Sequence, residues 1–388
     1  MSAQRNINLL VAMQALAGAT GPIIISLAGL VGLQLAKDPS LATLPVTSYN
    51  VGVAVAMLPV AWLLAHTGRR ATYLIGATVC ALAGLLAAFS IITHQFWFFA
   101  IATAFAGLYT ACAQNFRFAA ADLAEQGQQP RAISRVMLGG LAAAVIGPQV
   151  VIYSQGAVDS AQYAGSFFGL SLLALLALPI IVQLRVPQAL STDTSESGRA
   201  LLEIARTPPF AVGALCGVAS YGLMAFVMTA APLAMVGHGH AVNDATLGIQ
   251  WHVLAMFAPS FFTGGWIERY GKVAMTAFGF VLLAAAGFAA LSGVQVVHFW
   301  GSLILLGLGW NLSFVGATAI IAGSYRPAER AKVQAANDFL VFTTVALASL
   351  SAGYLLAMTS WEVLNQVTLP VVGGVLLVLF IWRNRIVD

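Results

Sequence analysis

Two short patterns of soft donor atoms stand in neighbouring apolar segments in the second half of the chain. One reads Met224-Ala-Phe-Val-Met228 and the other His252-Val-Leu-Ala-Met256. A step of four residues places both side chains of a pair on one face of an α-helix, about 6 Å apart. Thioether and imidazole groups suit Cu(I), whereas Mg²⁺ and Ca²⁺ prefer oxygen and Zn²⁺ usually takes thiolate or imidazole. The chemistry that this set favours is the reversible binding of copper.

The two pairs are expected at matched depths if their segments are antiparallel helices. Met228 and Met224 lie about 9 and 15 Å below the outer end of the first helix, and His252 and Met256 lie about 9 and 15 Å below the start of the second. Methionine is also a common gap filler in apolar helices. Spacing alone therefore leaves two interpretations open, a soft-metal site and ordinary packing.

Further donors flank this set along the chain. Met235, His238 and His240 follow the first pattern in a loop, where they could capture copper or could simply be exposed. Cys216 precedes Met224 by eight residues, about 12 Å along a helix, and is either a step on the way out or a small packing residue beside Gly217.

The composition requires lipid around the elements that carry these residues. Of the 388 residues, 60% are apolar and 8% are charged, against roughly 25% charged in an average soluble protein. An ordinary cytosolic enzyme is thereby excluded, and no catalytic triad, zinc-ligand cluster or phosphate-binding loop is present. At about 30 to 33 residues per span and loop, the length predicts twelve transmembrane helices in an all-α protein.

The expected spans are the apolar runs between polar clusters and Pro or Gly residues. They cover residues 7–36, 42–64, 71–93, 96–118, 132–155, 162–184, 209–234, 246–266, 273–292, 297–322, 332–357 and 363–382. The first run is too long for the core of a signal peptide, so we expect it to remain as a helix. If the N-terminus is cytoplasmic, every Lys and Arg except Lys37 falls on the cytoplasmic side. The positive-inside rule therefore predicts that both termini are cytoplasmic.

The chain divides into two similar halves. Residues 1–184 and 209–388 each hold six expected helices, and the polar stretch 185–208 is expected to be a cytoplasmic linker. Ala15-Leu16-Ala17-Gly18 in the first half is repeated as Ala214-Leu215-Cys216-Gly217 in the second. Two parallel six-helix repeats resemble the major facilitator superfamily.

A loop in the second half resembles the superfamily's cytoplasmic signature, G-x-L-a-D-r-x-G-r-k. Residues 264–272 read GGWIERYGK, with Glu268 at the acidic position and Arg269 and Lys272 as basic residues. The first half departs from it, with Ala65 in the acidic position and His66 in a basic one. A cytoplasmic gate based on Glu268 and a simple tight basic turn are both compatible with this pattern.

Few polar residues are expected inside the spans, where each is costly unless it faces a cavity or a partner. Asp338 is a candidate for ion coupling. The other polar residues could line a cavity or join helices by hydrogen bonds, namely Gln14, Asn50, Asn115, Gln149, Trp310 and Asn311.

The M-x-x-x-M and H-x-x-x-M patterns in the seventh and eighth spans resemble the CcoA-like copper importers of bacterial inner membranes. That resemblance implies a secondary transporter whose copper ligands are Met224, Met228, His252 and Met256. It also implies that copper is cargo with no resident cofactor, that delivery serves haem-copper oxidase assembly, and that a cytoplasmic copper acceptor protein can be a partner. We expect the protein to be surrounded by the lipid bilayer and not to bind nucleic acid.

The same wider group includes riboflavin transporters, which gives the alternative function. An isoalloxazine ring needs aromatic stacking partners, and Trp251, Trp310 and Tyr221 could provide them.

Overall fold

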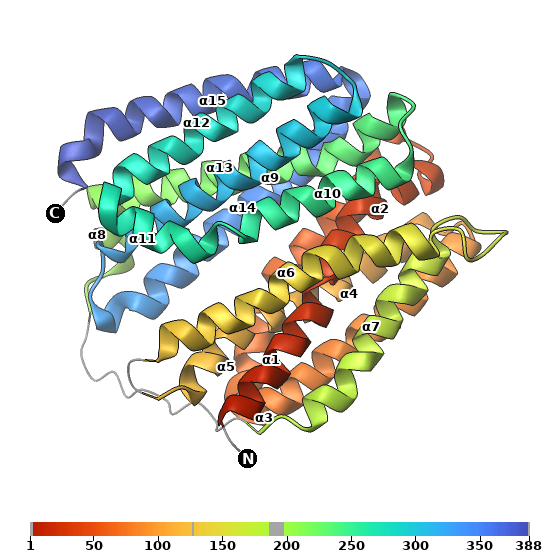
Figure 1. Cartoon of the computed structure of the whole chain (residues 1–388), viewed down its shortest axis with the longest axis horizontal. Coiled ribbons are helices and arrows are strands. Elements are labelled where there is room, and N and C mark those ends of the chain that lie inside the picture. Colours follow the sequence, from red (N-terminus) through yellow and green to blue (C-terminus); the bar gives the residue numbers. More distant parts are fainter. Residues whose placement is uncertain (1–2, 126–127, 186–197, 387–388) are drawn as a thin grey trace. The chain divides into compact units, whose positions relative to one another are not determined.

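The structure is a computed structural model that describes residues 3–125, 128–185 and 198–386, and these ranges consist of helices and their connections (Figure 1). No β-strand occurs in these ranges, so the predicted all-α fold class is confirmed. Most of the polar run Ser191–Gly198 in the expected linker lies outside the described residues.

The chain forms two compact units, each described here by itself. Unit 1 comprises Met1–Leu190 and Gly239–Leu254, and unit 2 comprises Ser191–His238 and Ala255–Asp388. The first helices are α1 (Ala3–Gly18), α2 (Thr20–Leu35), η1 (Pro39–Leu41), α3 (Leu44–Ile92), α4 (Phe96–Ala113), α5 (Phe116–Leu123), α6 (Gln129–Ser154) and α7 (Ala164–Val182). They are followed by α8 (Leu201–Ala205), α9 (Pro208–Gly237), α10 (Val242–Phe257), α11 (Ser260–Tyr270), α12 (Lys272–Leu291), α13 (Val296–Ala322), η2 (Pro327–Glu329), α14 (Arg330–Met358), α15 (Trp361–Trp382) and η3 (Arg383–Arg385).

Each of the twelve expected spans is present as helix. Among the described residues, 10 helical stretches are long and apolar enough to cross a membrane. One of them, Pro39–Ile92, holds two expected spans, because Gly68 adopts φ 77° and ψ 169° inside α3 and turns the chain there. The expected span 246–266 is divided between α10 and α11, which are separately too short to be counted.

Local residue types explain both interruptions. A positive φ favours glycine, which has no β-carbon to clash with the backbone. Pro259 stands just before α11, and the ring of a proline disfavours helical geometry in the residue before it. The break between α10 and α11 therefore falls beside a residue that disfavours a continuous helix.

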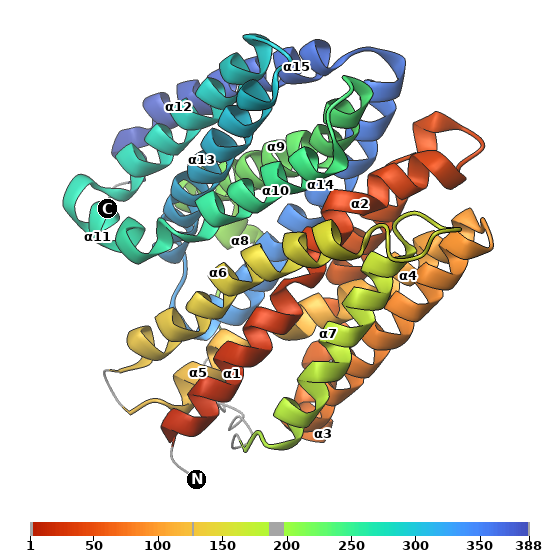
Figure 2. The same ribbon diagram turned by 45° about the vertical axis from the view of Figure 1, so that its right-hand side comes forward.

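Small residues bring the long helices of unit 1 together. A β-carbon at Gly52 of α3 would lie 2.0 Å from the carbonyl oxygen of Ala104 in α4, so only glycine permits this approach. Close backbone contact is the usual way in which helices associate in lipid. In the same unit α1 packs against both α6 and α7 (Figure 2).

Unit 2 has the same kind of packing. A β-carbon at Gly279 of α12 would lie 2.3 Å from the backbone nitrogen of Ser313 in α13. Helix α9 packs against α13 and α14, and α12 runs beside α15 (Figure 1). This arrangement directs side chains of α9, α13 and α14 toward one another and positions the candidate site.

Candidate functional site

Aromatic side chains from three helices of unit 2 meet around Tyr221 of α9. The Tyr221 ring meets Trp310 and Phe314 of α13 edge-on, with ring centroids 5.2 Å apart in each pair. Its centroid is 6.0 Å from that of Phe342 in α14. Edge-to-face geometry of this kind is favourable because the positive edge of one ring meets the negative face of another.

Trp310 and Phe314 form the wall of this group. One helical turn separates them on α13, and their rings stack with centroids 5.2 Å apart and planes 11° apart. Phe257, the last residue of α10, adds an edge contact to Trp310 at 6.3 Å. We call Tyr221, Phe257, Trp310, Phe314 and Phe342 the aromatic cluster.

The cluster combines ring surface with one free donor. Trp310 is only 7% exposed, whereas the other four rings are half-buried and keep part of their surface accessible. The Trp310 indole Nε1 is buried and has no hydrogen-bond partner among the described residues. A buried N–H without a partner costs roughly 1–3 kcal/mol. The cluster can therefore stack a flat heteroaromatic ligand and donate a hydrogen bond to it.

Asn311, the neighbour of Trp310, has a structural role instead. Its Nδ2 donates to the Met256 carbonyl oxygen and to Ser260 Oγ, each at 2.7 Å. Its Oδ1 accepts from Thr263 Oγ1 at 2.6 Å. Asn311 is 1% exposed and its amide is fully engaged, so it joins α13 to the break between α10 and α11.

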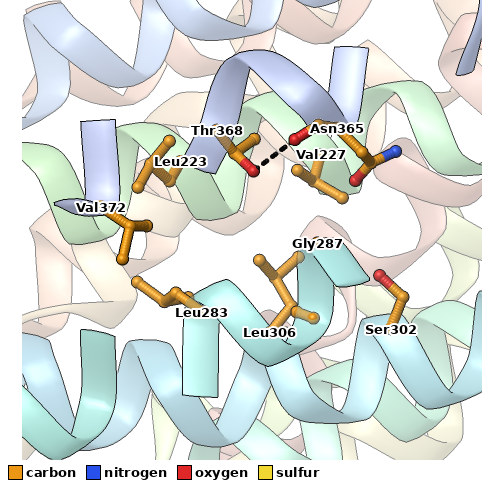
Figure 3. Close-up of a pocket in the computed structure, with 10 residues that line it drawn as sticks. Leu223, Val227, Leu283, Gly287, Ser302, Leu306, Asn365, Thr368 and Val372 are labelled. Atoms are coloured by element: carbon orange, nitrogen blue, oxygen red, sulfur yellow. Dashed lines mark hydrogen bonds between the residues drawn. The ribbon is translucent and has the colours of Figure 1, made fainter. Parts of the chain in front are cut away.

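A small cavity in unit 2 lies between α9, α12, α13 and α15 and is separate from the cluster (Figure 3). Its lining includes Leu223, Ser302, Asn365 and Thr368. Ser302 Oγ and Asn365 Oδ1 are buried without hydrogen-bond partners among the described residues. With a volume of about 10 Å³ the cavity has room for one water molecule. It is too small for an organic solute.

The four residues of the predicted copper set are all buried. Met224, Met228, His252 and Met256 are 1%, 7%, 0% and 6% exposed. Met224 and Met228 are on α9 of unit 2, whereas His252 belongs to the part of α10 that lies in unit 1. Within the described ranges no group of three or more His, Cys, Asp or Glu side chains is suitable for holding a metal ion.

The flanking donors differ in exposure. Met235 and Cys216 are 0% exposed, whereas His238 is exposed and its Nδ1 lies 2.7 Å from the Ala234 carbonyl oxygen. His240 is half-buried in unit 1. The stacking candidate Trp251 is 43% exposed and belongs to unit 1. Within unit 2 the structure brings Tyr221 and Trp310 together.

The predicted gate residues surround a tight turn. Glu268 and Arg269 are exposed on α11, and Gly271 adopts φ 88° before Lys272 begins α12. The guanidinium of Arg269 lies over the Tyr270 ring, 5.2 Å from its centroid. A gate at this turn remains a prediction.

The corresponding turn in unit 1 has an acidic partner that the sequence pattern did not reveal. Arg69, next to the Gly68 turn, forms an ion pair with Asp122 of α5. Asp122 is the only acidic residue in α5, so its type was visible in the sequence. It lies 53 positions from Arg69, however, and the sequence pattern gives no indication that the two side chains meet. Asp338, the predicted coupling residue, is exposed on α14 and accepts a 3.4 Å hydrogen bond from Asn337 Nδ2. Its coupling role remains a prediction.

Comparison with known proteins assigns the chain to a family. Residues 8–250 match the family model described as Major Facilitator Superfamily. The chain belongs to the major facilitator superfamily. It is 50% identical over 98% of its length, and over 96% of the relative, to "Riboflavin transporter RfnT" of Brucella anthropi. It is 28% identical to "Uncharacterized MFS-type transporter YdeG" of Bacillus subtilis, over 92% of this chain and 86% of that protein.

Solved structures have the same fold at low sequence identity. The nucleoside transporter NupG matches with a TM-score of 0.71 and 11% identity, covering 98% of each chain. A POT family transporter in complex with 5-aminolevulinic acid matches with a TM-score of 0.76 and 12% identity, covering 99% of this chain and 97% of the other. Family membership and the apolar helices together make this a multi-pass membrane protein of a transporter family.

The prediction of copper import is wrong. A relative with 50% identity along nearly the whole chain is a riboflavin transporter, which agrees with the alternative function. The comparison contradicts copper as the substrate, but it does not test the individual residues predicted for capture and exit, Met235, His238, His240 and Cys216. Burial of Met224, Met228 and Met256 agrees with the packing interpretation, because a methionine fills gaps between apolar helices at little cost. The spacing could not separate these interpretations.

Proposed function

We propose that this protein carries riboflavin or a closely related flavin across the bacterial inner membrane by alternating access. The observation that carries the proposal is the 50% identity with the riboflavin transporter RfnT over 98% of the chain. An identity this high over the full length favours a shared substrate class, although fold alone would not. The distribution of Lys and Arg along the sequence supports an orientation with both termini in the cytoplasm. We assign transport and no catalysis.

The aromatic cluster is the proposed ring-binding site. An isoalloxazine is flat, aromatic and uncharged, and it carries carbonyl oxygens along one edge. Tyr221, Phe314 and Phe342 keep accessible ring surface, and the Trp310 N–H is a donor without a partner in the described chain. Each aromatic contact of this kind contributes roughly 0.5–1.5 kcal/mol beyond the burial of area.

Uptake by a riboflavin-auxotrophic bacterium that lacks its own importer tests the function. Expression of this chain is expected to restore growth at low external riboflavin and to give accumulation of labelled riboflavin. Equal accumulation in cells carrying an empty vector would contradict the proposal. Radioactive copper measured in the same cells is expected to stay at the level of the empty vector.

Two substitutions one turn apart on α9 test the site. Tyr221→Ala removes the central ring of the cluster and is expected to lower riboflavin uptake at least tenfold at low substrate. Met224→Leu conserves volume and is expected to leave uptake within about twofold, because such exchanges are well tolerated in packed cores. Similar losses in both variants at equal protein levels would argue against a ring-binding role for Tyr221.

A further inference from the structure

A second polar atom beside the aromatic cluster also lacks a partner. Asn337 of α14 is 8% exposed, and its Nδ2 donates to Asp338. Its carbonyl oxygen, Oδ1, is buried and has no hydrogen-bond partner within the described ranges. Native proteins leave few buried acceptors unsatisfied, so an atom of this kind beside a candidate site points to a ligand.

Gly217 lies next to this oxygen and leaves room there for no more than a β-carbon. It precedes Tyr221 by one turn of α9. A β-carbon at Gly217 would lie 3.9 Å from Asn337 Oδ1, 3.9 Å from Phe314 Cε2 and 3.9 Å from Val341 Cγ2. These are ordinary contact distances, so alanine fits, whereas a longer side chain would cover both the amide oxygen and the edge of the Phe314 ring.

The unpartnered atoms are chemically complementary. Trp310 Nε1 is a donor on α13, and Asn337 Oδ1 is an acceptor on α14. Both atoms belong to residues at the aromatic cluster, in which Tyr221 contacts Trp310 and Phe314, and the Phe314 ring edge and Asn337 Oδ1 both lie beside Gly217. A ligand that stacks on these rings and carries both an acceptor and a donor would satisfy both atoms.

We propose that Asn337 Oδ1 accepts a hydrogen bond from the transported flavin beside Gly217, while the Trp310 indole N–H donates to a ring carbonyl oxygen. The inference rests on the proposed function and adds the polar recognition that sets specificity. The flavin has two kinds of donor, the imide N–H of its ring and the hydroxyls of its ribityl chain. A site that hydrogen-bonds its substrate discriminates strongly against analogues without the group, because its own buried atoms are then left unpaired.

Riboflavin binding to the purified full chain in detergent tests the proposal, with the Kd measured from the quenching of flavin fluorescence. Asn337→Leu and Trp310→Phe are each expected to raise the Kd for riboflavin at least tenfold. The matched controls are Asn365→Leu and Trp361→Phe, which remove the other buried Asn Oδ1 and indole N–H that lack partners in unit 2. Both controls are expected to bind within about twofold of the unmodified chain. Equal effects in the test and control variants would overturn the proposal.

Two further arms do not depend on deleting a polar group. Gly217→Ala is expected to bind riboflavin normally and Gly217→Leu is expected to lose at least tenfold, and normal binding by Gly217→Leu would overturn the placement. With the unmodified chain, N3-methylriboflavin lacks the imide N–H and lumiflavin lacks the ribityl hydroxyls. The analogue without the recognised donor is expected to bind at least tenfold more weakly than riboflavin, and to show no further loss with Asn337→Leu.

The outcomes separate this inference from the proposed function. Suppose that the unmodified chain binds riboflavin, but that Asn337→Leu weakens the binding of riboflavin and of both analogues by the same factor. The proposal of flavin transport is then unaffected, and the proposed role of Asn337 is wrong. If the unmodified chain binds no riboflavin, the proposed function and this inference both fail.

Discussion

Asn311 and Trp310 are adjacent in sequence and have opposite hydrogen-bonding states. The Asn311 amide makes three hydrogen bonds to the region where α10 ends and α11 begins, whereas the Trp310 N–H makes none within the described ranges. Satisfied polar groups hold helices together, and unsatisfied ones cost free energy that a ligand can restore. One residue is therefore assigned to the scaffold and the other to the binding site.

Replacing Asn311 by leucine is expected to destabilise the protein rather than to affect ligand specificity. The Met256 carbonyl oxygen would lose a buried partner, at a cost of roughly 1–3 kcal/mol, whereas the Thr263 hydroxyl would still donate to the Pro259 carbonyl oxygen. We expect a fall in Tm of about 1–4 °C, measured on the purified protein by thermal unfolding. The relative affinities for riboflavin and lumiflavin should not change. An unaltered Tm would contradict the scaffold role.

The sequence alone predicted some residues of the candidate site and missed others. Tyr221 and Trp310 were predicted as possible stacking partners from their type, and the structure brings their rings into contact. Asn337 was not singled out, because an unpartnered carbonyl oxygen is a property of packing and leaves no pattern in the sequence. The Met and His spacing gave a clear pattern, but regular spacing on an apolar helix arises equally from gap filling.

At the scale of elements, an ion-paired clasp holds the start of α8 to the connection between α13 and α14. The Arg199 guanidinium donates to both oxygens of Glu329, at 2.9 Å from Nε to Oε1 and at 2.7 Å from Nη2 to Oε2. The backbone nitrogens of Arg199 and Arg326 also donate to this carboxylate, at 2.8 and 2.9 Å. The Glu329 side chain is 0% exposed. Because the carboxylate is paired and hydrogen-bonded on both oxygens, it holds Arg199, within the expected linker 185–208, to the connection between α13 and α14.

The clasp predicts a specific protease sensitivity. Glu329→Gln presents an amide N–H to the Arg199 donors and is expected to release residues 198–205. Cleavage by trypsin after Arg199 should then be at least tenfold faster than in the unmodified chain in membrane vesicles. The conservative control is Glu203→Gln, which alters an exposed carboxylate of α8 with no hydrogen-bond role in the clasp. Equal cleavage rates in the two variants would contradict the clasp.

The pH dependence of the clasp follows from the same contacts. The hydrogen bonds from Arg199 and Arg326 lower the pKa of Glu329 far below its ordinary value. A lowered pKa in the folded state gives stability that is fully present above the unfolded value, near 4.5, and is lost as the pH falls toward the folded value. Cleavage after Arg199, normalised to a peptide substrate, is therefore expected to stay constant between pH 5 and 8. A marked rise within that range would show that Glu329 is not held in this way.

Hydropathy predicted the elements well, and local backbone chemistry explains where the prediction was too simple. Each expected span is helical, because an apolar segment in lipid must satisfy its backbone hydrogen bonds internally. The break at Pro259 was missed, since a run that remains apolar across a proline gives no hydropathy signal. The partner of Arg69 was missed for a different reason, because the ion pair with Asp122 depends on how α3 and α5 pack.

At the scale of the whole molecule, the asymmetry of basic residues is the strongest feature that sequence provides. Of the 17 Lys and Arg residues, only Lys37 lies in a segment expected outside the cytoplasm. The rule works because basic residues close to span ends resist translocation, and it does not depend on contacts in the folded state. The geometry of the candidate site cannot be predicted in this way, because it depends on how side chains pack within unit 2.

The orientation can be tested with a membrane-impermeant maleimide, because Cys80, Cys112 and Cys216 are buried and should give little background. Two exposed positions serve as reporters, Ser160 between α6 and α7 and Ala200 at the start of α8. Ser160→Cys is expected to react in intact spheroplasts, since its loop lies outside when the N-terminus is cytoplasmic. Ala200→Cys should react only after the membrane is disrupted, which also confirms that its thiol is accessible. The opposite labelling pattern would show that the orientation is the reverse of the predicted one. The Arg199–Glu329 clasp would then lie outside the cytoplasm, in disagreement with the distribution of basic residues.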